Sequence, residues 1–118
     1  MKRYVELTEN GKASHLRIET RYDLGGPNWA YGGMTKRGYY LHVSPVTLER
    51  RNGYTMETYA AFTGCKQLLK EVTRKSAKAE AAADVIAKNY IHSMVLYVCE
   101  SNGLPIPEEF TEGAVTWA

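Results

Sequence analysis

The chain has 118 residues, of which 44% are hydrophobic and 11% aromatic; this length and composition predict one globular domain over residues 1–118 and exclude a second one. Fifteen Lys and Arg residues against thirteen Asp and Glu residues give a net charge of +2, which is too small to indicate a nucleic-acid or membrane partner by itself. Two cysteines, Cys65 and Cys99, are too few for a zinc cluster or a disulfide scaffold. With no apolar run typical of a signal peptide or membrane span, we expect a cytoplasmic protein without membrane contact.

Residues 3–22 alternate between apolar and polar side chains on either side of Asn10-Gly11. Asn-Gly is the strongest short signal for a β-hairpin because both turn positions need a positive φ. A two-residue turn places Val5 opposite Leu16, on one apolar face. The sequence therefore predicts a hairpin with this register.

Residues 24–38 hold five of the ten glycines and predict a long loop, because this glycine density sustains neither a helix nor a well-packed strand. We predict that the loop binds a partner, with Trp29 and Tyr31 as aromatic anchors and Lys36 and Arg37 beside them. The alternative is that both rings pin the loop to the core. A phosphate site is a further alternative, although the glycine spacing matches no Walker or dinucleotide pattern.

Residues 38–61 predict a second hairpin, with its turn at Asn52-Gly53. A two-residue turn pairs Leu48 with Glu57, whereas a three-residue loop pairs Leu48 with Met56. We prefer the three-residue loop because it places two apolar side chains opposite each other.

The apolar spacing changes from two to 3.6 after residue 62, which predicts an amphipathic helix over residues 63–75. A longer helix is predicted over residues 76–101, ending at Asn102-Gly103 as a C-cap. One continuous helix is the rival interpretation, and we place a break near Lys75-Ser76 because a helix of about 57 Å exceeds the width of so small a domain. One helical turn is expected at residues 108–110.

These elements predict an α+β fold in which an antiparallel sheet of two hairpins packs against a C-terminal helical segment. The chain divides into a hairpin half (1–62, with the Gly-rich loop 24–38), a helical half (63–103) and an acidic tail (104–118). The residues expected to be largely buried are Leu16, Ile18, Leu41, Val43, Ile86, Tyr90 and Met94.

The middle of the chain is basic and predicts a charged face at i,i+4 spacing with a second basic point at the hairpin tip. Its residues are Arg50, Arg51, Lys66, Lys70, Arg74 and Lys78. The alternative is an ordinary solvated helix face. No histidine lies in a metal-ligand spacing, and no nucleophile has a recognisable base, so we expect no metal, no cofactor and no catalytic residue, and a non-enzymatic protein is favoured.

The segments Tyr22-Asp23-Leu24-Gly25-Gly26 and Lys36-Arg37-Gly38-Tyr39-Tyr40-Leu41-His42-Val43-Ser44-Pro45-Val46 resemble a group of small, largely uncharacterised proteins encoded by prophages and integrative mobile elements of gut Firmicutes. The similarity continues through Ala61-Phe62-Thr63-Gly64 and the following half of the chain. The resemblance implies the context of accessory genes, among which inhibitors of host defence are frequent, and it brings no catalytic residues.

Three functions follow from the sequence. The first is a small interaction protein of a phage or mobile element, a counter-defence (anti-CRISPR-like) inhibitor that binds a host protein or a protein–nucleic-acid complex. The second is a nucleic-acid-binding accessory protein that uses the basic middle region. The third is a nucleotide-binding protein or small enzyme built on the Gly-rich loop.

Overall fold

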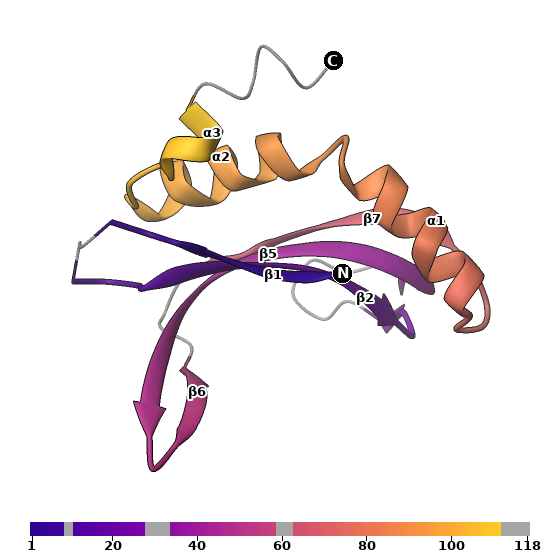
Figure 1. Cartoon of the computed structure of the whole chain (residues 1–118). Helices are drawn as coiled ribbons and strands as arrows, with labels where there is room; N and C mark the ends of the chain where they lie inside the picture. Colours follow the sequence, from indigo (N-terminus) through magenta and orange to yellow (C-terminus); the bar gives the residue numbers. More distant parts are fainter. Residues whose placement is uncertain (9–10, 28–33, 59–62, 112–118) are drawn as a thin grey trace.

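The computed structural model describes residues 1–8, 11–27, 34–58 and 63–111. Its elements are β1 (Lys2–Glu6), β2 (His15–Asp23), β3 (Gly26–Pro27), β4 (Met34–Thr35), β5 (Gly38–Arg51), β6 (Tyr54–Thr58), β7 (Cys65–Glu71), α1 (Ala77–Ala87), α2 (Ile91–Asn102) and α3 (Glu108–Thr111). In the main antiparallel sheet, β1 pairs with β2 and β2 pairs with β5. β5 also pairs with β6 and β7, and the helices cover one face of this sheet (Figure 1). The predicted α+β class, a sheet packed against a C-terminal helical segment, is confirmed.

The first hairpin has the predicted register. Val5 pairs with Leu16, and both side chains are buried. The neighbouring Tyr4 points to the other face and is exposed. Because the strand period is two, a slip of one residue would move this apolar set into solvent, and burial therefore fixes the register that the Asn-Gly turn favours.

The second hairpin has a two-residue turn, and the predicted three-residue loop is wrong. Asn52 and Gly53 have φ angles of 50° and 82°, both positive, as a type I′ turn requires. Leu48 therefore pairs with Glu57 instead of Met56. The side chains of Leu48 and Met56 both lie outside the hydrophobic core. The turn residues, not the pairing of apolar side chains, therefore decide the register here.

The predicted helix over residues 63–75 is also wrong, because β7 occupies most of this segment and pairs with β5. The register shifts between Tyr39 and Tyr40, so that Leu69 is the extra residue of a β-bulge. The bulge accommodates the consecutive Leu68 and Leu69 in a strand, although the apolar positions of this segment also fit the spacing of a helix. Pairing with the otherwise open edge of β5 outweighs local helical spacing.

The helical segment begins and ends where the sequence predicts. The hydroxyl of Ser76 accepts a hydrogen bond from the N–H three residues later at 3.0 Å, as an N-cap does. Gly103, with a φ of 64°, ends α2. A turn at residues 88–90 divides the predicted helix over 76–101 into α1 and α2. The predicted turn at 108–110 lies within α3.

The core lies between the sheet and the helices. Leu16, Ile18, Leu41 and Val43 have no exposed surface, and Met94 is 8% exposed, as expected. Ile86 and Tyr90 were expected to be buried but are only half-buried at the border of the core. Phe110 of α3 is 1% exposed and closes the core beyond α2. In the described part of the chain, no helix covers the opposite face of the sheet (Figure 1), and we call it the open face.

Candidate functional site

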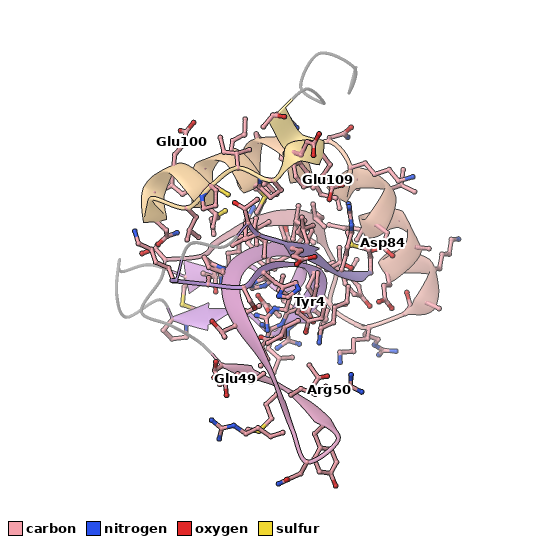
Figure 2. The ribbon with its side chains drawn as sticks, turned by 60° about the vertical axis from the view of Figure 1, so that its left-hand side comes forward. Tyr4, Glu49, Arg50, Asp84, Glu100 and Glu109 are labelled. Atoms are coloured by element: carbon pink, nitrogen blue, oxygen red, sulfur yellow. The ribbon has the colours of Figure 1, made fainter. Side chains whose placement is uncertain are left out.

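The distal half of the β5–β6 hairpin, residues 47–58, extends away from the sheet on the side opposite to the helices (Figure 1). We call this segment the arm. Figure 2 shows Glu49 and Arg50 on the arm and Glu100 and Glu109 on the helices, at opposite ends of the view. A two-stranded hairpin is marginally stable alone, so its contacts with the sheet decide how firmly it is held.

One face of the arm presents large side chains to solvent. Arg51 pairs with Tyr54, and Met56 is two residues further along the same strand, so the three side chains share a face. Tyr54 is 72% exposed and Met56 is 45% exposed. Tyr, Met and Arg are the residue types enriched where proteins bind each other. The same face carries Glu49, which pairs with Met56 and lies 2.9 Å from Arg51. Its exposed Tyr, Met and Arg side chains are of the types found in protein-binding surfaces.

The base of the arm is held by a buried charge cluster on the open face. The side chain of Arg17 is only 8% exposed and forms ion pairs with Glu19, at 3.2 Å, and with Glu57 of the arm. Glu57 also accepts a hydrogen bond from the Tyr4 hydroxyl at 2.6 Å, which raises the pKa of Tyr4. We call these four residues the Arg17 cluster. Moving the arm would separate buried opposite charges, so the cluster fixes its direction.

A second polar cluster lies elsewhere on the open face. Nε2 of His42 lies 3.1 Å from Oδ2 of Asp23, and Nζ of Lys66 lies 3.9 Å from the same oxygen. Lys66 also lies over the ring of Tyr40, 5.0 Å from its centroid. Burial lowers the pKa of His42, and the nearby Asp23 carboxylate opposes this effect without cancelling it. Within the described chain, no Ser or Cys nucleophile is hydrogen-bonded to this histidine, so the pair lacks the arrangement of nucleophilic catalysis.

A Ser–His contact near the tip of the first hairpin was not predicted from the sequence. Oγ of Ser14 lies 2.7 Å from Nδ1 of His15 and accepts a hydrogen bond from the Leu48 N–H at 2.8 Å. A hydroxyl has one proton and two lone pairs, so the tautomer of His15 decides which of the two atoms donates in this contact. In the described residues no carboxylate orients the far nitrogen of His15, so this contact links β2 to β5 and does not assemble a catalytic triad.

The predicted partner-binding loop is described only in part. Trp29 and Tyr31 lie outside the described residues, and their role stays a prediction. Lys36 and Arg37 lie at the base of the loop and are exposed. Nζ of Lys36 lies 3.6 Å from the carboxylate of Glu71, and Arg37 donates a hydrogen bond to a loop carbonyl at 3.0 Å.

Two loop glycines are required by close backbone contacts. A Cβ at Gly25, whose φ is 72°, would lie 2.6 Å from the carbonyl oxygen of Thr35. A Cβ at Gly38 would lie 2.2 Å from the carbonyl oxygen of Lys70. Real Cβ atoms do not approach backbone this closely. Strand packing alone therefore explains these two glycines, without a phosphate ligand.

The predicted basic face does not lie on one helix. Lys66 and Lys70 are on β7, Arg74 is in the following turn, and Lys78 is in the first turn of α1. Arg50 and Arg51 are on the arm, where Arg51 lies 2.9 Å from Glu49. The i,i+4 argument fails because β7 is a strand. The fold instead brings Lys70, Arg74 and Lys78 to the end of the sheet that also holds the base of the Gly-rich loop.

Sequence reasoning missed the Arg17 cluster. The alternation in the first hairpin places Arg17 on the polar face, but nothing in the local pattern indicates that this face is covered. Glu57 lies 40 residues further along the chain, and only the correct two-residue turn positions it on the side of the arm that meets Arg17. The signal available in the sequence was the Asn52-Gly53 pair itself.

Comparisons of the chain with protein-family models, with curated proteins and with solved structures find no match. The resemblance to proteins of mobile elements therefore stays a prediction. Across residues 1–8, 11–27, 34–58 and 63–111, no three His, Cys, Asp or Glu side chains are grouped in a way that would hold a metal ion. No helix in this part of the chain has the length and apolar character needed to cross a membrane.

Proposed function

We propose that the protein is a non-enzymatic interaction protein and that its arm docks on the surface of another protein. The observation that carries this proposal is the exposure of Tyr54 and Met56, 72% and 45%, on a hairpin that extends from the sheet. Large side chains of this kind contribute most of the binding energy when they enter a partner's pocket. Arg51, which shares their face, favours a pocket with a carboxylate at its rim.

The attachment of the arm supports the same proposal. The Arg17 cluster holds Glu57 at the base of the arm in the free protein. A hairpin already fixed in direction loses less conformational freedom on binding than a mobile one, which strengthens association. The arm is thus a pre-organised docking element.

The resemblance to proteins of mobile elements supplies the biological context of the proposal. We propose that the partner is a cytoplasmic host protein, alone or within a protein–nucleic-acid complex, and that the protein acts as a counter-defence inhibitor. An inhibitor of this kind needs a binding surface and no active site. The polar clusters described above are consistent with that requirement, because each is explained by packing of the open face.

The test is affinity capture from a host lysate with the double variant Tyr54→Ala, Met56→Ala. A matched control is Val85→Ala, Tyr97→Ala, because these side chains are 64% and 58% exposed on the helices. The arm variant is expected to lose the captured protein, with at least a 30-fold weaker Kd for the purified partner, corresponding to about 2 kcal/mol. The control is expected to retain it, and both variants should melt within about 2 °C of the wild type.

Treatment of the lysate with nuclease separates the alternatives. A partner that is captured after nuclease treatment and lost with the arm variant supports the proposal. If the arm variant captures the same proteins as the wild type, the arm is not the docking surface. If every captured protein disappears with nuclease, the interaction is with nucleic acid instead.

A further inference from the structure

We infer that a second surface, formed where β7 meets α1, binds the phosphate backbone of a nucleic acid. We call this surface the basic end, and its residues are Lys36, Arg37, Lys70, Arg74, Lys75 and Lys78. This inference does not rest on the proposed role of the arm. The arm and the first turn of α1 lie at opposite ends of the molecule in Figure 1.

Backbone pairing and one tyrosine bring the basic end together from three segments. Gly38 pairs with Glu71, and the N–H of Val72 donates to the carbonyl of Arg37 at 3.3 Å. The hydroxyl of Tyr39 accepts a hydrogen bond from the N–H of Ser76 and donates one to its carbonyl, both at 3.2 Å. The base of the Gly-rich loop, the end of β7 and the start of α1 are therefore adjacent.

The positive charge of this surface is only partly neutralised. Glu71 lies near Lys36, and both are about two-thirds exposed. Among the described residues, no carboxylate forms an ion pair with Lys70, Arg74 or Lys78, and all three side chains are exposed. The positive end of the α1 dipole points the same way. A concentrated positive field of this kind attracts polyanions.

The shape and the other groups of the basic end favour phosphate as the ligand. A shallow hollow of about 570 Å³ lies between β7 and α1, and its polar lining consists of Thr73, Arg74, Ser76 and the carboxylate of Glu71, which lies 3.6 Å from Nζ of Lys36. Hydroxyl groups and cations are the side chains that contact phosphate oxygens most often. Among the described residues, the aromatic rings nearby are those of Tyr39, which is buried in the core, and Tyr22, which is half-buried and packs against Tyr39. Among the described residues, bases therefore have no stacking platform at this surface, and because phosphate contacts carry no sequence information, binding is expected to be independent of sequence.

The number of cations sets the expected salt dependence. If four to six phosphates are neutralised, log K against log salt falls with a slope of about −4 to −5 for duplex DNA. Each cation removed makes the slope of log K against log salt shallower by about one. Reversing Lys70 and Arg74 to Glu is therefore expected to reduce the slope by about two and the affinity by at least tenfold.

The experiment measures fluorescence anisotropy of labelled duplex DNA, single-stranded DNA and duplex RNA of random sequence over a salt series. The test variant is Lys70→Glu, Arg74→Glu, and the control is Arg50→Glu, Arg51→Glu on the arm, which changes the net charge by the same amount. We expect wild-type binding with a steep salt slope, an at least tenfold weaker affinity with a shallower slope in the test variant, and an affinity within about twofold of the wild type in the control. Melting temperatures confirm that both variants fold.

Three outcomes overturn the inference. The first is no binding to any of the three nucleic acids at low salt, and the second is an equal loss of binding in both variants, which assigns the effect to net charge alone. The third is a nuclease-resistant protein partner that Lys70→Glu, Arg74→Glu abolishes, which makes the basic end a surface for an acidic protein. The variant Tyr54→Ala, Met56→Ala should bind nucleic acid normally, so a failure of the arm proposal is distinguishable from a failure of this one.

Discussion

Removal of Glu57 or Arg17 tests how the arm is held. Glu57→Gln keeps the shape of the side chain and removes its charge, while Arg17 retains Glu19. Arg17→Met keeps much of the aliphatic volume and leaves two carboxylates without their cation. Both changes act on side chains that are less than a fifth exposed, since Arg17 is 8% and Glu57 is 17% exposed.

The magnitudes follow from the burial of the two side chains and from the ion pairs and hydrogen bonds that each change removes. Hydrogen bonds to charged groups contribute about 1.5–3 kcal/mol, and breaking a buried ion pair costs about 3–5 kcal/mol. Because Glu19 still neutralises Arg17, we expect Glu57→Gln to lower the free energy of unfolding by about 2 kcal/mol. Arg17→Met should lower it by about 3 kcal/mol. The double variant should lose about 3 kcal/mol instead of 5, a coupling of about 2 kcal/mol between the two residues.

The assay is urea unfolding of the wild type, the two single variants and the double variant, supported by thermal melts. At about 3–5 °C per kcal/mol for a chain of this size, Glu57→Gln should lower Tm by about 6–10 °C. Arg3→Met is the control, because the ion pair of Arg3 with Glu109 is nearly half-exposed and should contribute less than about 1 kcal/mol. If Arg17→Met destabilises no more than Arg3→Met, or if the single effects add, the cluster does not hold the arm.

Three further predictions concern the sheet and the thiols. Gly38→Ala should lower the free energy of unfolding by about 3 kcal/mol, because its Cβ would lie 2.2 Å from the Lys70 carbonyl oxygen; Gly11→Ala, which has open space around it, should lower it by only about 1–2 kcal/mol in the same urea titration. Because burial places the pKa of His42 below the ordinary 6.5, the unfolded chain binds the proton first as pH falls, so stability should decrease from pH 6.5 downward. In melts at stepped pH, His42→Asn should flatten this decrease, and identical slopes for variant and wild type would contradict the assignment. Burial raises the pKa of Cys99 to about 11, so a thiol reagent at pH 8 should modify the half-buried Cys65 first, and mass spectrometry showing the reverse order would refute this burial argument.

Local sequence signals determined several elements by themselves. The first hairpin has the predicted register, which the Asn10-Gly11 pair and the alternation of residues 3–22 both favour in the sequence, although Asn10 itself lies outside the described residues. Ser76 and Gly103 cap the helical segment for equally local reasons, a side-chain acceptor and a left-handed backbone. In each case, neighbours within a few residues supply the interaction that decides the structure.

The second hairpin shows where one local rule should have outweighed another. The Asn52-Gly53 pair favours a two-residue turn, and the apolar-pairing argument favoured a three-residue loop. Pairing of apolar residues decides register only when a core covers one face of the hairpin. The arm extends from the sheet, so the turn residues alone were decisive.

Only the tertiary structure decided the state of residues 65–71. Their apolar positions satisfy a helix and also a strand with a bulge at Leu69. The open edge of β5 selected the strand, and its paired residues lie 22 to 33 residues earlier in the chain. Because of this pairing, the basic residues that were predicted on one face of a helix lie instead on a strand, in a turn and on a helix.

Both candidate surfaces likewise depend on interactions between distant segments. Arg17 meets Glu57 because β5 bends and its hairpin partner returns to the open face. The segment with Lys36 and Arg37 lies beside the end of β7 because β5 and β7 are antiparallel neighbours. Residue types and local turns can be read from one sequence, whereas contacts between distant segments depend on how the whole chain closes its sheet and buries its core.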